Sequence, residues 1–99
     1  MAQNLRWTGN ANNSLFFDEQ NWIDVVNNTI PPQGSLEPNT GINYDLIIEN
    51  ASTEIEANGI INLGNSTFSI TNATLNATAL SSGQVSLHTE AYVNLSANN

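Results

Sequence analysis

Carboxylates near the start of the chain have types and spacing that suit acid–base chemistry. Asp18, Glu19 and Asp24 lie within one short segment, and glycoside hydrolysis uses a pair of carboxyl groups. The neighbouring residues are mostly Asn and Gln, however, and carboxylates in such a segment usually face water. We therefore interpret these three side chains as surface groups and not as catalytic residues.

A second group combines a hydroxyl, an imidazole and a carboxylate. Ser86, His88 and Glu90 alternate along one segment, so an extended chain would present all three on one side. Nucleophilic catalysis needs such groups within hydrogen-bond reach, whereas alternate residues of a strand lie about 7 Å apart. A flat strand also offers no oxyanion hole. We predict no catalytic residues, and we expect that the protein is not an enzyme.

Binding chemistry is better represented than catalysis. Asp18, Asp24 and Asp45 are candidate calcium ligands, because calcium takes six to eight oxygen atoms, yet no calcium-loop motif surrounds them. A second candidate site is a ligand-binding face made by His88, Glu90 and Tyr92, which could contact a carbohydrate. Calcium is the one cofactor that the sequence suggests.

These side chains must be positioned by strands. From Val85 to Leu95 the odd positions are apolar or small and the even positions are mostly polar, which predicts one unbroken strand with one face buried. Helix formers are sparse, while Asn, Ser, Thr and Gly are frequent, and these residues favour strands and turns.

A repeat lies upstream of that strand. Ile48-Glu49-Asn50-Ala51-Ser52 recurs as Ile70-Thr71-Asn72-Ala73-Thr74, and repetition at this distance is typical of solenoids. The period-two alternation slips by one residue at each Asn, which indicates a bend. Asn tolerates the left-handed conformation that a bend needs, and stacked Asn side chains can form a hydrogen-bonded ladder. Asn50 and Asn72 are therefore predicted to be structural corners.

Together these patterns predict an all-β fold. We expect a short right-handed parallel β-helix, or solenoid, with an N-terminal cap; the alternative is an antiparallel β-sandwich. Residues 1–43 would form the cap segment and a loop rich in Pro and Gly, and residues 44–99 would form the solenoid rungs. Both parts would belong to one domain, since the chain has only 99 residues.

The N-terminal half carries a resemblance to a known class. The order Trp7-Thr8-Gly9, Asn21-Trp22, a proline-containing loop and then Asp45-Leu46-Ile47-Ile48 resembles bacterial extracellular proteins of the autotransporter type, which have a parallel β-helix. The resemblance implies that the first segment caps the apolar end of the solenoid. It also implies a location outside the cell, in a protein that displays, adheres or carries other modules.

Composition excludes several partners. Arg6 is the only basic residue against nine carboxylates, and the net charge is -8. Nucleic acids and anionic bilayers require clustered Lys and Arg, so we expect neither partner. No apolar run is long enough for membrane insertion, and the start of this sequence has no secretory signal pattern. With no cysteine, disulfides and zinc–thiolate sites are impossible.

We therefore predict a non-enzymatic, extracellular or cell-surface module, acidic and rich in asparagine, with a structural or adhesive role. Its expected partners are copies of itself or neighbouring solenoid rungs, because open strand edges can pair with other strands. It would belong to a larger surface protein or a self-assembling fibre. The alternative is a carbohydrate-binding module of a secreted protein that acts on polysaccharides.

Overall fold

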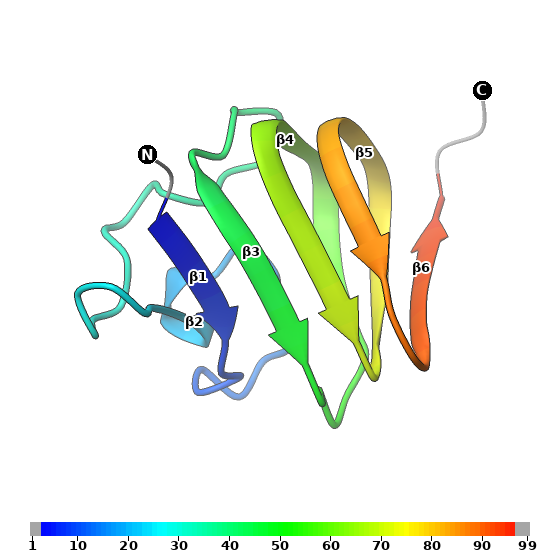
Figure 1. Ribbon diagram of the computed structural model, residues 1–99, viewed down its shortest axis with the longest axis horizontal. Coiled ribbons are helices and arrows are strands. Elements are labelled where there is room, and N and C mark those ends of the chain that lie inside the picture. Colours follow the sequence, from blue (N-terminus) through cyan, green and yellow to red (C-terminus); the bar gives the residue numbers. More distant parts are fainter. Residues whose placement is uncertain (1–2, 97–99) are drawn as a thin grey trace.

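The computed structural model describes residues 3–96, and it is made of strands with one short 3-10 helix (Figure 1). The elements are β1 (Gln3–Trp7), η1 (Glu19–Asn21), β2 (Trp22–Asp24), β3 (Tyr44–Glu49), β4 (Ile55–Thr71), β5 (Ala73–Leu87) and β6 (Ala91–Leu95). Within this part of the chain no helix is long and apolar enough to cross a membrane.

The strands form one six-stranded sheet in the order β2-β1-β3-β4-β5-β6. Only β1 and β2 pair in antiparallel fashion, and every other neighbouring pair is parallel. The expected all-β class is confirmed. The alternative of an antiparallel β-sandwich is wrong, because there is a single sheet and its pairing is mostly parallel. The sheet is also open, with β2 and β6 at its two edges.

The two copies of the sequence repeat lie side by side. Ile48 of β3 pairs with Ile70 of β4, and Glu49 pairs with Thr71. The pairing continues beyond β4. Ile70 pairs in turn with Leu87 of β5, and Ala73 of β5 pairs with Ala91 of β6. The buried columns pair apolar residues with apolar residues because neighbouring parallel strands in register bury the same face.

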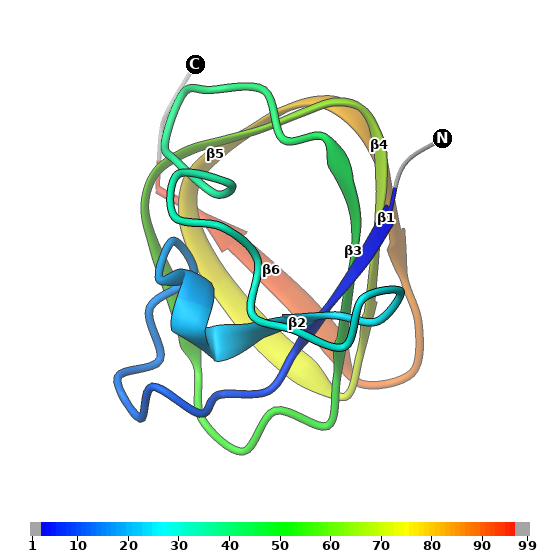
Figure 2. The ribbon, with the colours of Figure 1, turned by 90° about the vertical axis from the view of Figure 1, so that its left-hand side faces the viewer.

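β4 and β5 are long strands that bend. Their pairing shifts register at three places, and bulges of this kind turn a strand sharply. Gly83 lies at one bend with a φ of +67°, and a Cβ there would stand 2.4 Å from Leu63 Cβ, so only glycine fits. Viewed along the axis of the molecule, the bent strands surround a common interior (Figure 2).

That interior is one apolar cluster. Along β4 buried and exposed residues alternate near both ends of the strand, as the sequence pattern predicted. Residues from both sequence segments contribute: Leu5 of β1 and Leu36 of the proline-containing loop are as fully buried as Ile61 and Leu75 of the long strands. β1 lies between β2 and β3 in the sheet, so the two segments share it.

Aromatic side chains close the N-terminal end of this interior. Phe16 packs edge-on against Trp22 with ring centres 5.2 Å apart, and it reaches Phe68 of β4 at 5.9 Å. Trp7 also meets Trp22 edge-on. In the end-on view, β1, β2 and the loops around them lie in front of the longer strands (Figure 2).

The last predicted strand is broken in two. β5 ends at Leu87 and β6 begins at Ala91, so the expected unbroken strand from Val85 to Leu95 is wrong. Glu90 sits at the turn between them with a φ of 57°. The alternation pattern did not reveal this turn, because Ala91 lies four positions after Leu87 and an even offset keeps the same odd–even phase. The odd positions therefore remain apolar on both sides of it.

Candidate functional site

The corners of the chain form a column. Asn50, Asn72 and Glu90 all adopt left-handed backbone conformations, with φ of 55°, 50° and 57°. The Asn72 side-chain amide donates to Asn50 Oδ1 over 2.9 Å. Two backbone hydrogen bonds also hold successive corners together: Asn50 N donates to Thr71 O, and Asn72 N donates to Thr89 O. The third member is Glu90, so the amide ladder stops at Asn72. These corners set where the loop of residues 51–54 leaves the sheet.

The three candidate calcium ligands are separate. Asp18 caps η1 by accepting from Gln20 N and also accepts from Asn13 Nδ2, while Asp45 Oδ1 accepts from Thr67 N. Among residues 3–96 no group of three acidic or histidine side chains could hold a metal ion. The structure does not bring these aspartates together, and each carboxylate has a local hydrogen-bonding partner.

Asp24 is the one buried carboxylate, and it organises the turn after β2. Burial by itself opposes ionisation, but the backbone N–H groups of Asn27 and Val26 and the Asn27 side-chain amide all donate to it. These hydrogen bonds lower the pKa of Asp24 below its ordinary value. The ionised form therefore holds the turn.

The predicted row of His88, Glu90 and Tyr92 is not a row. Because the chain turns between β5 and β6, His88 and Glu90 lie in the turn and only Tyr92 lies in a strand. Tyr92 is 55% exposed, and its hydroxyl lies 3.3 Å from Glu90 Oε1. These two side chains line a shallow depression of about 210 Å³ with Thr53, Asn72 and Thr74, and His88 is not part of it.

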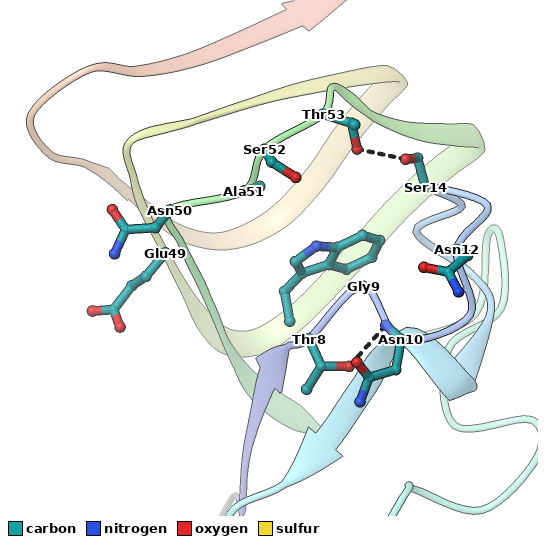
Figure 3. Close-up of a pocket in the computed structure, with 11 residues that line it drawn as sticks. Thr8, Gly9, Asn10, Asn12, Ser14, Glu49, Asn50, Ala51, Ser52 and Thr53 are labelled. Atoms are coloured by element: carbon teal, nitrogen blue, oxygen red, sulfur yellow. Dashed lines mark hydrogen bonds between the residues drawn. The ribbon is translucent and has the colours of Figure 1, made fainter.

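A larger pocket of about 440 Å³ lies between two segments far apart in sequence, residues 7–14 and 49–53 (Figure 3). Sequence reasoning assigned no ligand to it. Hydroxyl and amide side chains dominate its lining, including Thr8, Asn10, Asn12 and Ser52, and Glu49 is its only carboxylate. We call it the Trp7 pocket, because Trp7 is the one aromatic residue that lines it.

The segment of residues 7–14 is held by tight turns and by one buried amide. Gly9, Asn12 and Ser14 have positive φ values, so the chain reverses repeatedly over a short distance. The fully buried Asn21 side chain accepts from Ala11 N and donates to Leu15 O and Asn13 Oδ1. The buried Asn21 therefore fixes the loop, and the side chains of Asn10 and Asn12 make no hydrogen bond to another described residue and line the pocket.

A hydroxyl pair joins the two sides of the pocket. Ser14 Oγ and Thr53 Oγ1 are 2.6 Å apart, and Figure 3 shows them facing each other at one end. The only sequence signal for this pocket was a cluster of turn-forming residues near Trp7. The parallel pairing of β1 with β3 brings this cluster next to residues 49–53. That contact depends on the fold, so no local sequence pattern indicated it.

Outward-facing side chains form a second polar ladder. Asn94 Nδ2 donates to Asn76 Oδ1, and Asn76 Nδ2 donates in turn to Glu54 and Glu56. Register explains the stacking, since Glu56 pairs with Asn76 and Asn76 with Asn94. The amides all donate in the same direction, so Asn94 Oδ1 remains available as an acceptor at the β6 edge.

Comparison of the chain with protein-family models, with curated proteins and with solved structures gave no match. The resemblance to extracellular β-helix proteins therefore stays a prediction from short sequence motifs.

Proposed function

We propose that this chain is a non-enzymatic structural or adhesive module of a larger extracellular or cell-surface protein. In this proposal it is a short right-handed parallel β-helix behind an N-terminal cap. The outer edge of β6 accepts one more strand, from a neighbouring rung or from a second copy. The stacked 22-residue repeat and the Asn ladder support the β-helix.

One observation carries the proposal: within residues 3–96, the interior columns continue into an end that no strand covers. Ile48 and Ile70 are fully buried, but Leu87, which pairs with Ile70, is 52% exposed. In a second column Ala77 is buried, while its partner Leu95 is 49% exposed. β6 covers only the first residues of β5, from Ala73 to Ala77, so Leu87 lies on a part of β5 that has no outer neighbour among residues 3–96. A further turn of chain laid on β6 and on the end of β5 would remove this apolar surface from water, which is favourable.

The backbone of β6 supports the same interpretation. Within residues 3–96, β6 pairs only with β5, so its outer N–H and C=O groups have no strand partner. Unpaired edges are templates for strand addition unless charge or proline blocks them. β6 itself contains no charged residue and no proline, and Glu90 directly precedes it. Asn94 Oδ1 would continue the amide ladder onto an added strand.

Composition and short motifs support the proposed location outside the cell. The chain is acidic, has no lysine and is rich in asparagine, and its motifs resemble those of surface proteins. These features are common in secreted and surface proteins.

Sedimentation velocity at rising protein concentration tests strand addition. We expect reversible self-association of the isolated chain, which the double variant Leu87→Lys, Leu95→Lys abolishes by placing two charges at the open end. The matched control is Val26→Lys, Ile30→Lys, which adds the same charge at two exposed apolar residues near β2. The control should associate like the unmodified chain.

Two outcomes would count against the proposal. If the unmodified chain remains monomeric at every concentration, its edge does not recruit a second copy. If both double variants lose association equally, the effect comes from net charge and not from the β6 edge.

A further inference from the structure

We propose that the Trp7 pocket and the Tyr92 depression form one extended site for a neutral oligosaccharide. The two hollows share the loop of residues 51–53, so a chain of sugar units can cross that loop from Trp7 to Tyr92. This goes beyond strand addition at β6, which needs neither hollow.

The two tryptophans of the chain differ in a way that points to a ligand. Trp22 Nε1 is buried and donates to Phe16 O over 2.8 Å. Trp7 Nε1 has no such partner among the described residues, and none of their buried side-chain nitrogen or oxygen atoms is left unsatisfied, so this N–H meets solvent. Buried indoles normally find a partner, and here the partner can be a ligand hydroxyl.

Gly9 keeps that N–H accessible. A Cβ at position 9 would stand 3.4 Å from Trp7 Nε1, so any side chain there would lie against the indole nitrogen. Trp7 itself is only 8% exposed, because its ring packs against Trp22. It therefore offers a fixed donor at the wall of the pocket and not a broad stacking surface.

The other polar groups of the pocket suit sugar hydroxyls. The side chains of Asn10, Asn12 and Ser52 line the pocket and make no hydrogen bond to another described residue. Amides and hydroxyls both donate and accept, as a sugar hydroxyl does, and Glu49 adds an acceptor. A volume of about 440 Å³ falls in the usual range for ligand pockets.

Charge decides between classes of glycan. The pocket lining includes no Lys or Arg, it includes Glu49, and the whole chain carries a net charge of -8. A sulfated or uronic polysaccharide would be repelled. The scarcity of apolar lining disfavours a hydrophobic ligand. A neutral glycan is the class that remains compatible with both observations.

Tyr92 supplies the second part of the site. Its ring is exposed on the far side of the 51–53 loop, and Glu90 next to its hydroxyl provides an acceptor. An aromatic face can pack against the C–H groups of a sugar ring. The Ser14–Thr53 hydroxyl pair fixes one end of the shared loop, so the two parts are held before binding.

NMR titration provides a direct test, because the chain has two indole N–H signals and one serves as the internal control. The probes are cello-, xylo-, manno- and laminari-oligosaccharides, each from the monosaccharide to the hexasaccharide, with tetramethylammonium chloride as a cationic probe. We expect at least one series to move the Trp7 signal while the Trp22 signal stays still. Affinity should rise with chain length.

Variants separate the two parts of the site. Trp7→Phe keeps an aromatic ring but removes the N–H, and it should weaken binding about tenfold, equivalent to ~1.4 kcal/mol. Tyr92→Ala should abolish only the gain from longer chains. Ser52→Ala provides a milder test in the pocket if Trp7→Phe fails to fold, and Asn65→Ala, exposed in β4 and outside both hollows, should bind like the unmodified protein.

The proposal is overturned if no oligosaccharide moves the Trp7 signal. A shift with tetramethylammonium alone would also overturn it, by showing a cation site. Unchanged binding in both Trp7→Phe and Ser52→Ala would place any glycan elsewhere. A failed titration leaves strand addition at β6 untouched, since the sedimentation experiment measures that separately.

Discussion

The two ends of this molecule differ in how far they shield the apolar interior from water. At the N-terminal end the interior is closed by the short antiparallel strand β2 and by three aromatic rings that pack edge to face, those of Phe16, Trp22 and Trp7. At the C-terminal end the same interior columns finish in Leu87 and Leu95, both about half exposed. A stack of parallel strands has apolar ends wherever it stops. Within residues 3–96, aromatic side chains close one end, which we call the capped end, and no strand covers the other, which we call the open end.

The capped end should contribute most to stability. Phe16→Ala removes a fully buried ring that contacts Trp22 and Phe68, and we expect a loss of about 3–5 kcal/mol in the free energy of unfolding. The matched change at the open end, Leu87→Ala, should cost about 1 kcal/mol, since that side chain is already half in water. Urea unfolding of both variants measures the difference. Equal losses would remove the distinction between the ends.

The corner column should come next in size. Asn72→Ala places a residue that resists the left-handed conformation at φ 50° and also removes the bond to Asn50, for a cost of about 1–2 kcal/mol. Asn72→Gly loses the same bond but accepts the conformation, so it should recover most of the stability. If Ala and Gly behave alike in thermal unfolding, the backbone conformation is not what requires Asn there.

A smaller, pH-dependent effect is expected at the capped end. The pKa of Asp24 is lowered by its hydrogen bonds to Asn27 and Val26, so its ionised form stabilises the fold above the pKa of the unfolded chain. That stabilisation is lost as pH falls through the folded-state pKa. Asp24→Asn should therefore lower the melting temperature near neutral pH, and the difference should vanish in acid. The opposite pH dependence would contradict this assignment.

The smallest effect should be a gain at the open end. Glu90 occupies the corner position that Asn fills in the two preceding turns of the chain. Glu90→Asn should suit the left-handed conformation and let the new amide donate to Asn72 Oδ1, raising stability by about 0.5–1 kcal/mol. Glu90→Gln is the control, because it has the amide without the tolerance for positive φ. A gain in both variants would point to charge removal instead.

Much of the fold was predictable because it depends on local patterns. Alternation near the ends of β4 indicated a strand with one buried face, and the phase slips indicated bends at Asn50 and Asn72, where φ is positive. The bend at Glu90 was not predictable in this way. The extra residue in that turn restores the odd–even phase, so a period-two pattern runs through it unchanged.

The sequence predicted less of the candidate site than of the fold. Tyr92 and Glu90 were identified as neighbours, but the Trp7 pocket was missed because its two sides lie about forty residues apart along the chain. The sequence identified Trp7 only as part of the Trp7-Thr8-Gly9 motif, and in the structure its ring is buried against Trp22. Its free N–H becomes visible only once Gly9 and the 51–53 loop are placed around it.

By itself the sequence determined the all-β class, the two Asn corners and the acidic, cation-poor surface, because local backbone preference, side-chain period and charge are properties of neighbouring residues. Only the tertiary structure decided between parallel and antiparallel pairing, showed which side chains close one end of the interior and which stay exposed at the other, and placed Trp7 beside residues 49–53. Those features depend on register between distant segments, and register is set by how the whole apolar face is buried.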